Sequence, residues 1–411
     1  MPNSPVTITW VTNEAGQRFK NSLAFAGTID RSYDDQFAKK AGAKVGNTIL
    51  ARLPNLPTIR SGQAWAPTGV TDRTVPVTLT YQKGADFEWS SIQATTELDE
   101  IRKRSIDPAA DGLASTVDMD AMNDVYTSVF NNQGTPGTTA STNLTYLTAK
   151  SKIFDLAGPN TQLAAVLDVV SSFTLQNANV AIFNPGNRIS ENFRAGRFSG
   201  PALGIEDWYE SQSTPTHTTG TFTSCTPQIN SANQTGSSIP SICWASNATT
   251  LLKGDCVEFA GCYSVNPLTK KSTGRLQQFV ITANCTDTTG TMTLPISPSI
   301  STSGSLQTVS ASPANTAAVY VWNTRSTTYA LSTAVSPQNF IYHRDFATLV
   351  MVDLEDPIAG AVTRRIQSKD YNISLRMVQQ YLLQPDQNGT RLDCIYGAAP
   401  LQPRLAARVA S

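Results

Sequence analysis

The residues that could do chemistry in this sequence are few and widely spaced. Its 411 residues include only two histidines, His217 in a Thr- and Pro-rich run and His343 next to Arg344 and Asp345. Nucleophilic or general acid–base catalysis needs such a base beside a nucleophile or a carboxylate. The sequence also has no GxSxG elbow, no Walker loop and no GxGxxG fingerprint. We therefore expect no catalytic residue, and we expect His343 to make a structural hydrogen bond.

The cysteines and the aspartates of one predicted helix are the remaining candidates for a reactive or metal-binding site. Five of the six cysteines fall between residues 225 and 285 and the sixth is Cys394, without any CxxC pair. Zinc ligands normally come in such pairs, so we interpret the cysteines as reduced and partly buried. We interpret Asp118, Asp120 and Asp124 as a solvated helix face, because no paired ligands accompany them. The sequence thus predicts no metal and no cofactor.

Charge is scarce and balanced over the whole sequence. Lys and Arg number 31, Asp and Glu also number 31, and charged residues make up 15% of the chain, below the roughly 25% of average soluble proteins. Zero net charge disfavours tight binding to a nucleic acid backbone, although weak and non-specific contact with DNA stays open. No apolar run has the length of a membrane span, and the N-terminus lacks the pattern of a signal peptide. We expect a cytosolic product without membrane contact.

The stretch from residue 211 to 343 has an unusual composition. It is rich in Thr, Ser and β-branched residues, and we expect strands near residues 255–260, 276–283, 291–296, 318–322 and 328–331. Short strands at this spacing predict a small barrel or sandwich inserted into another domain. With so few charges, the insert should bury much of its polar face against itself or a neighbour. Its eight charged residues are Lys253, Asp255, Glu258, Lys270, Lys271, Arg275, Asp287 and Arg325.

The sequence on either side of this stretch predicts a mixed α+β fold. In the helix that we expect from Asp107 to Asn131, apolar residues such as Leu113, Val117 and Ala121 recur every four positions and predict a buried stripe. Two further helices are expected, one over residues 12–26 with Thr12 as N-cap and one over residues 160–172. Strands are expected over residues 48–53, 75–80, 180–185 and 371–381, and another in about the last twenty residues.

A long hairpin is expected between the strands at residues 48–53 and 75–80. The connection carries four prolines between Pro54 and Pro76 and little that could form a core. Loops of this kind normally contact another molecule. Together with the absence of a reactive constellation, the hairpin indicates a protein that contacts copies of itself.

Six stretches are informative when taken in order: KVGNTILARLP leading to VPVTLTYQKGADFEWSS, SIDPAADGLASTVDMDAMNDVY, NVAIFNP, GIEDWYESQSTPTHTTGT, LLKGDCVEFAGCYSVNPLTKKSTGRLQQFVI with the following ISPSI, and SLRMVQQYLLQPDQNGTRLDCIYG. Together they resemble the major capsid proteins of tailed bacteriophages, in the branch typified by the P22 coat protein. The resemblance covers nearly the whole chain, and it rests on the order and spacing of the stretches.

The resemblance implies the HK97 capsid fold with an inserted β-barrel domain. It places an N-terminal arm over residues 1–44, an extended loop hairpin over 45–92, a spine helix with peripheral and axial domain parts over 93–210, the inserted barrel over 211–343, and the remaining axial and peripheral parts over 344–411. In this branch the inserted domain aids subunit folding and contacts other capsomers through a loop that corresponds to SCTPQINSANQTGSSIPS. That stretch has no charged residue, so its contacts would use hydrogen bonds and apolar packing.

The function that the resemblance implies is structural. The chain would self-assemble into pentamers and hexamers of an icosahedral shell around double-stranded DNA, with scaffolding and portal proteins as partners. It would be assembled in the host bacterial cytoplasm and remain in the virion capsid. The extended loop would lie over the adjacent subunit, and we take Arg52, Arg60 and Arg73 as candidates for its intersubunit ion pairs.

An alternative from another class is a carbohydrate-binding or adhesive β-rich virion protein, such as a decoration or tail component. The Thr-rich insert would then supply hydroxyl groups, and Trp208, Trp244 and Trp322 would supply stacking faces. An enzyme is a third and weaker alternative, because no site supports it.

Overall fold

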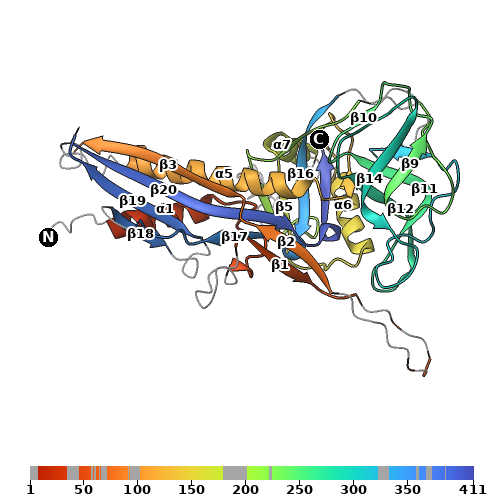
Figure 1. The fold of residues 1–411 in the computed structure, drawn as a ribbon, viewed down its shortest axis with the longest axis horizontal. Coiled ribbons are helices and arrows are strands. Elements are labelled where there is room, and N and C mark those ends of the chain that lie inside the picture. Colours follow the sequence, from red (N-terminus) through yellow and green to blue (C-terminus); the bar gives the residue numbers. More distant parts are fainter. Residues whose placement is uncertain are drawn as a thin grey trace. The chain divides into compact units, whose positions relative to one another are not determined.

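The structure is a computed structural model and describes residues 8–34, 46–56, 59, 62–63, 65, 72–90, 92, 102–178, 201–221, 225–322, 333–357, 361–366, 373–384 and 386–411. Strands predominate over helices (Figure 1), as expected for a mixed α+β fold. The chain divides into two units, each built from three segments. Unit 1 consists of Met1–Ala51, Thr74–Met122 and Ala347–Ala399, and unit 2 of Arg52–Arg73, Asn123–Phe346 and Pro400–Ser411.

Unit 1 is built on a long antiparallel sheet. Its strand order is β17 (Ala347–Val352), β20 (Gln387–Pro400), β19 (Leu375–Leu382) and β18 (Val362–Ile366), and β3 (Tyr81–Ser90) also pairs with β20. Strands β3 and β20 stay in register from Tyr81, opposite Tyr396, to Ser90, opposite Gln387. Figure 1 shows these two strands running side by side along this sheet. The strands expected near residues 371–381 and in the last part of the chain are therefore confirmed.

Two helices of unit 1 correct the expected helix boundaries. Helix α1 (Ile8–Ser22) begins before Thr12, so Thr12 is not an N-cap; its hydroxyl donates to Met377 Sδ at 3.6 Å. Helix α5 (Asp107–Tyr126) follows a π-helical turn, Arg102–Ile106. It ends before the expected residue 131, because Asn132 and Gln133 form a short strand instead. The predicted apolar stripe of α5 is confirmed, since Leu113, Val117, Ala121 and Val125 are buried.

The aspartates of α5 do not form a solvated face, which corrects the expectation for two of them. Asp118 is 2% exposed and Asp120 is 7% exposed. The Asp118 carboxylate accepts backbone hydrogen bonds from Ala24 at 2.7 Å and from Ala26 at 2.8 Å. The Asp120 carboxylate accepts the Tyr396 hydroxyl at 2.6 Å and pairs with Lys83 at 2.7 Å. These buried carboxylates hold α5 to the segment after α1 and to strands β3 and β20.

Asp118 should make stability depend on pH in the direction opposite to most aspartates. Burial raises the pKa of its carboxyl to about 6, and the backbone N–H donors offset this only in part. A raised pKa gives stability that is complete below the unfolded pKa of about 3.9 and is lost as pH rises through about 6. Relative to Asp118→Asn, we expect the wild-type free energy of unfolding to fall by on the order of 2 kcal/mol between about pH 4 and pH 7.

Urea unfolding at a series of pH values checks this, with Asp111→Asn as the control. The pKa of Asp111 is lowered, mainly by its hydrogen bond from Arg18. Its contribution to stability is therefore present above the unfolded pKa and is lost as pH falls, so the sign reverses. Parallel pH curves for wild type and Asp118→Asn would contradict the prediction.

Unit 2 contains a sheet whose strand order is β4 (Asn132–Gln133), β21 (Ala406–Ala410), β16 (Val335–His343), β5 (Leu163–Leu167) and β6 (Asp207–Glu210), with β7 (Thr216–Thr218) also paired to β16. Helix α6 (Asn143–Asp155) packs Tyr146, Ala149 and Ile153 into the core of this sheet. Helix α7 (Val169–Ala178) follows β5.

The helix expected over residues 160–172 is wrong. Leu163–Leu167 forms β5, and all five of its residues are buried. A central strand that is covered on both faces has a continuous apolar run, which cannot be distinguished from a buried helix by periodicity. Helix α6 went unpredicted, although its buried Tyr146, Ala149 and Ile153 recur at helical spacing.

The insert forms a second six-stranded sheet in unit 2. Its order is β15 (Val319–Val321), β11 (Cys256–Val265), β12 (Ser272–Ile281), β14 (Thr291–Ile300), β9 (Gly236–Ile242) and β8 (Gln228–Ile229), and β10 (Thr250–Leu251) pairs with β13 (Cys285–Thr286). Four of the expected strands thus exist; β9 was not expected. The two edge strands are joined as well, because Ile229 N–H donates to Ala317 O and Val319 N–H donates to Pro227 O, both at 2.9 Å.

The hairpin expected near residue 50 begins as predicted. Strands β1 (Thr48–Leu53) and β2 (Arg73–Thr78) form a two-stranded sheet. The strands expected over residues 180–185 and 328–331 lie outside the described residues. None of the helices in the described part of the chain has the length and apolar character of a membrane span.

Candidate functional site

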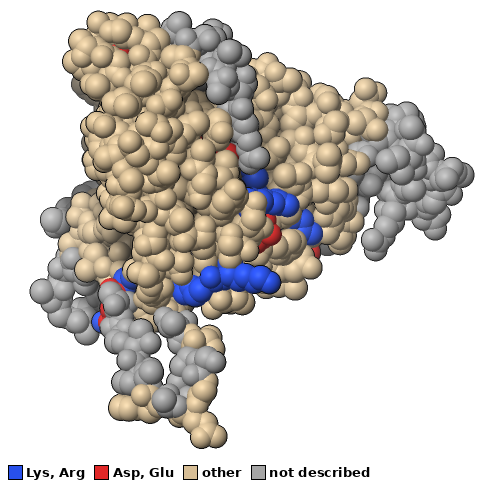
Figure 2. All heavy atoms as spheres, turned by 90° about the vertical axis from the view of Figure 1, so that its right-hand side faces the viewer, with Lys and Arg blue, Asp and Glu red and all other residues tan. Residues whose placement is uncertain are grey.

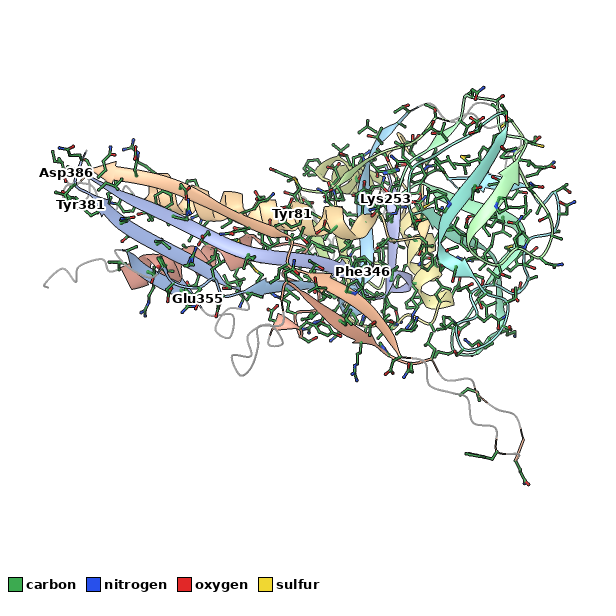
Figure 3. All side chains as sticks on the ribbon, viewed as in Figure 1. Tyr81, Lys253, Phe346, Glu355, Tyr381 and Asp386 are labelled. Atoms are coloured by element: carbon green, nitrogen blue, oxygen red, sulfur yellow. The ribbon has the colours of Figure 1, made fainter. Side chains whose placement is uncertain are left out.

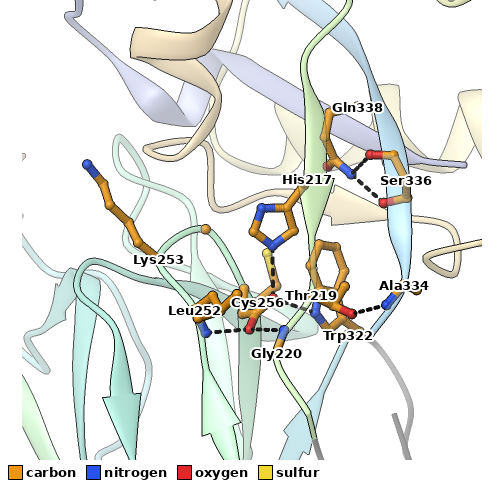
Figure 4. Close-up of polar contacts among 12 residues, drawn as sticks. His217, Thr219, Gly220, Leu252, Lys253, Cys256, Trp322, Ala334, Ser336 and Gln338 are labelled. Atoms are coloured by element: carbon orange, nitrogen blue, oxygen red, sulfur yellow. Dashed lines mark hydrogen bonds and ion pairs between the residues drawn. The ribbon is translucent and has the colours of Figure 1, made fainter. Parts of the chain in front are cut away.

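A buried polar cluster lies at the junction of the insert with the rest of unit 2 (Figure 4). At its centre is Asp255, which is fully buried. One carboxylate oxygen contacts His217 Nε2 at 2.9 Å and accepts Trp322 Nε1–H at 3.0 Å. The other accepts the N–H groups of Gly220 at 3.1 Å and Leu252 at 2.7 Å. Asp255 thus connects the chain entering the insert, its first long strand and its last strand.

The positive charge of this cluster comes from Arg408, near the end of the chain. Arg408 is fully buried, and its Nη2 donates to Gly254 O at 2.7 Å and to Cys256 Sγ at 2.9 Å. Its guanidinium also lies over the rings of Tyr126 and Trp322, at 6.0 and 5.7 Å from their centroids. Buried charges are tolerated when they are compensated and hydrogen-bonded, so the cluster acts as a structural clamp.

Backbone geometry requires glycine at one position of the clamp. Gly254 has φ of +103°, and a Cβ there would lie 2.9 Å from His217 Cε1. Only glycine adopts that conformation without strain and leaves room for the imidazole. His217 is held in place by Asp255, which identifies a structural role for it.

No catalytic arrangement appears among the described residues. His343 Nδ1 accepts the Asp345 N–H at 3.2 Å, which confirms the structural hydrogen bond expected of it. No group of three or more His, Cys, Asp or Glu side chains in the described part of the chain is placed to hold a metal ion. All six cysteines are free. Burial raises the pKa of the Cys262 and Cys285 thiols to about 11 and that of Cys394 to about 12, so they stay protonated at neutral pH.

The surface of the insert is almost uncharged. In Figure 2, which views the molecule from the side of β9, β11 and β14, uncharged residues form most of the visible described surface, and Lys and Arg appear in a few groups. All three carboxylates of the stretch, Asp255, Glu258 and Asp287, are buried. Three backbone N–H groups within 3.1 Å, from Asn247 to Thr249, donate to Asp287. The insert thus buries its carboxylates against its own backbone; the expectation that it buries much of its polar face against itself or a neighbour stays a prediction.

The hairpin between β1 and β2 carries exposed apolar side chains. Ile59 is 78% exposed and Trp65 is 85% exposed. We take these two side chains as candidates for a contact with another molecule, since the loop between β1 and β2 was expected to make one.

The structure places two of the three arginines that we took as contact candidates. Arg52 has an exposed side chain on β1. Arg73, at the start of β2, is partly buried, and its Nη2 donates to Pro54 O at 3.3 Å. Arg60 lies outside the described residues. The roles of all three in contacts between subunits stay predictions.

The tryptophans do not suit the alternative of a carbohydrate-binding protein. Trp244 is 4% exposed and Trp322 is 1% exposed, so neither presents a face on which a sugar could stack. Trp208 is partly buried, and its indole N–H donates to Ala202 O at 3.2 Å.

Comparison with known protein families identifies the chain. The sequence matches the family described as P22 coat protein, gene protein 5, over residues 17–408. The chain belongs to the P22 coat protein family. As a member of this family it is a major capsid protein of a tailed bacteriophage, a structural protein of the virion capsid that assembles with copies of itself. The resemblance seen in the sequence is thereby confirmed.

Solved structures of phage proteins share features with this coat protein at low sequence identity. A structure from Mycobacterium phage Che8 has 12% identity and a TM-score of 0.47, covering 94% of this chain and 90% of that chain. The capsid of Ralstonia phage GP4 has 7% identity and a TM-score of 0.44, covering 94% and 88%. The CUS-3 coat protein I-domain has 25% identity and a TM-score of 0.19, covering 25% and 98%. No curated protein sequence matches the chain.

Sequence reasoning missed the clamp of Asp255 and Arg408. The insert has few charges, and a carboxylate in its KGDC turn could have been singled out on that ground. Arg408 gave no such signal, because it lies 152 positions from Cys256.

Proposed function

We propose that this coat protein forms the pentamers and hexamers of an icosahedral shell that encloses double-stranded DNA, with the HK97 fold. The observation that carries the proposal is the family match over residues 17–408, which leaves out only the two ends of the chain. The long β3–β20 sheet, the long helix α5 and the β1–β2 hairpin are elements that this fold would use as peripheral domain, spine and extended loop.

The segments of the chain take the following roles in the proposal. Residues 1–44 form the N-terminal arm, 45–92 the extended loop hairpin, 93–210 the spine helix with peripheral and axial parts, 211–343 the inserted domain, and 344–411 the rest of the axial and peripheral domains. Strand β16 ends at His343, where the insert is proposed to end, and pairs with β5 and β21 from the flanking segments.

The inserted domain is proposed to be a closed β-barrel. Backbone hydrogen bonds between its two edge strands support closure of the six-stranded sheet. A closed sheet leaves no unpaired edge. The core inside it includes Phe259, Phe279, Leu294 and Trp322. Its uncharged stretch SCTPQINSANQTGSSIPS is proposed to contact other capsomers by hydrogen bonds and apolar packing.

The extended loop is proposed to lie over the adjacent subunit. Ile59 and Trp65 would supply apolar contacts, and Arg52, Arg60 and Arg73 would supply ion pairs. Scaffolding and portal proteins are the proposed partners during assembly in the host cytoplasm, and packaged DNA would be contacted weakly because the chain has no net charge. We propose no enzymatic activity.

Electron microscopy of the purified protein tests the proposal. Recombinant chain, with a scaffolding protein where one is needed, should give closed shells whose reconstruction shows five-fold and six-fold capsomers. Tubes or sheets alone would contradict the icosahedral arrangement, and a monomer under every condition would contradict self-assembly.

A further inference from the structure

A pocket in unit 2 has apolar walls and two arginines. It has a volume of about 270 Å³ and is lined by residues from the β1–β2 hairpin, the insert and the segment before β21, among them Leu56, Phe130 and Leu401. Arg73 and Arg404 line the same pocket. This volume lies below the roughly 300 to 1,000 Å³ of sites for drug-sized ligands. It suits one or two protruding side chains.

The two arginines have unused capacity for an anion. Arg73 Nε is buried without a hydrogen-bond partner in the part of the chain that the structure describes. Arg404 donates to Leu156 O at 2.8 Å and to Gln402 Oε1 at 2.9 Å. Its pKa is lowered by burial and then by the positive charge of Arg73. A buried guanidinium without a carboxylate is costly, and a carboxylate between the two would relieve their repulsion.

The turn between β19 and β20 has the complementary chemistry. Tyr381 is 51% exposed, Leu382 is 42% exposed and Leu383 is 84% exposed. The Tyr381 hydroxyl donates to the exposed carboxylate of Asp386 at 2.8 Å, and Figure 3 shows these two residues together at the end of the β19–β20 hairpin. The turn thus offers leucine side chains that could cover the apolar walls of the pocket and a carboxylate that could face its two arginines.

We propose that the pocket receives the β19–β20 turn of a second copy of the chain, with Leu383 against the apolar walls and Asp386 facing Arg73 and Arg404. This inference rests on the proposed self-assembly and names one of its contacts. A free phosphate group would pair with the two arginines but would leave the leucine and phenylalanine walls uncovered, so a segment that carries both a carboxylate and apolar side chains fits the lining better.

Charge reversal tests the ion pair. Arg73→Glu and Asp386→Arg should each lower the yield of shells at least tenfold at a fixed protein concentration, and the double variant should restore it to within about threefold. Glu88→Arg reverses another exposed carboxylate of the same sheet and should not rescue Arg73→Glu. Thermal unfolding of the unassembled chains should match wild type, since Arg73 makes a single long hydrogen bond.

Mixed-copy crosslinking tests the contact without altering a charge. Both preparations carry Cys243→Ser, which removes the exposed native thiol. One also carries Leu56→Cys and the other Leu383→Cys; after joint assembly and mild oxidation, a covalent dimer should form in the mixture and in neither preparation alone. Lack of that dimer in well-formed shells overturns the inference and leaves the proposed function intact. Normal assembly of both single charge variants overturns it too, as does loss of DNA retention alone, which would indicate a phosphate site. If wild type forms no shells, the proposed function itself fails.

Discussion

Asp255→Ala is expected to abolish soluble, folded coat protein or to lower its free energy of unfolding by about 4 kcal/mol or more. The substitution removes the acceptor of hydrogen bonds from His217, Gly220, Leu252 and Trp322. The cluster is buried, so each donor left unpaired costs about 1 to 3 kcal/mol. The Trp322 ring, over which the Arg408 guanidinium lies, would also lose the acceptor of its N–H group. Urea unfolding and the soluble fraction after expression measure the effect.

Two further variants show whether the hydrogen-bond acceptor is what matters. Asp255→Asn keeps the shape and one acceptor oxygen but turns an NH₂ group toward two donors, so an intermediate loss is expected. Asp345→Ala removes a carboxylate that is 60% exposed and lies 3.8 Å from His343, and it should change the free energy of unfolding by less than about 0.5 kcal/mol. Equal stability of Asp255→Ala and Asp345→Ala would refute the clamp.

Trp65→Ala is expected to raise the protein concentration needed for shell assembly about 30-fold, or to prevent assembly. Tryptophan at the centre of an interface contributes about 2 kcal/mol or more, and 2 kcal/mol corresponds to about a 30-fold change in affinity. Trp65 is 85% exposed in the single chain, so the unassembled protein should keep its free energy of unfolding. Light scattering over a concentration series, with microscopy of the products, measures the threshold.

Matched variants separate a loop contact from a general loss of apolar surface. Trp65→Phe keeps a ring at the same position and should retain most of the assembly. Leu144→Ala removes a 72% exposed side chain from α6 and should shift the threshold much less. A threshold that rises equally for Leu144→Ala would show that Trp65 has no special place in the contact.

The spacing of apolar residues along the sequence predicted those helices and strands in which buried residues recur at a regular interval. The apolar stripe of α5 and the alternating strand β1 could be predicted from the sequence, because each has one buried face. The strand β5 could not be, since it is buried on both faces and its apolar run also fits a helix. The end of α5 was predicted too late in the chain. The sequence favours a longer helix, but Asn132 pairs with Arg408 in a β-sheet instead.

The burial of two aspartates of α5 could not be predicted from the local sequence either. Asp118 and Asp120 look like a solvated face, because burial of a carboxylate depends on donors that the local sequence does not contain. Their partners lie 94 and 276 positions away, at Ala24 and Tyr396.

The sequence by itself determined that the chain has a charge-poor, strand-rich insert and the ordered stretches of a phage coat protein. Composition and periodicity are properties of the local sequence, so they can be assessed without knowing the fold. Only the tertiary structure decided where the few charges go. Asp255 and Arg408 meet in one buried cluster, and Arg73 meets Arg404 in one pocket. Strand pairing brings together Asp255 and donors that lie far from it in the chain, and the interior tolerates this carboxylate because it is hydrogen-bonded.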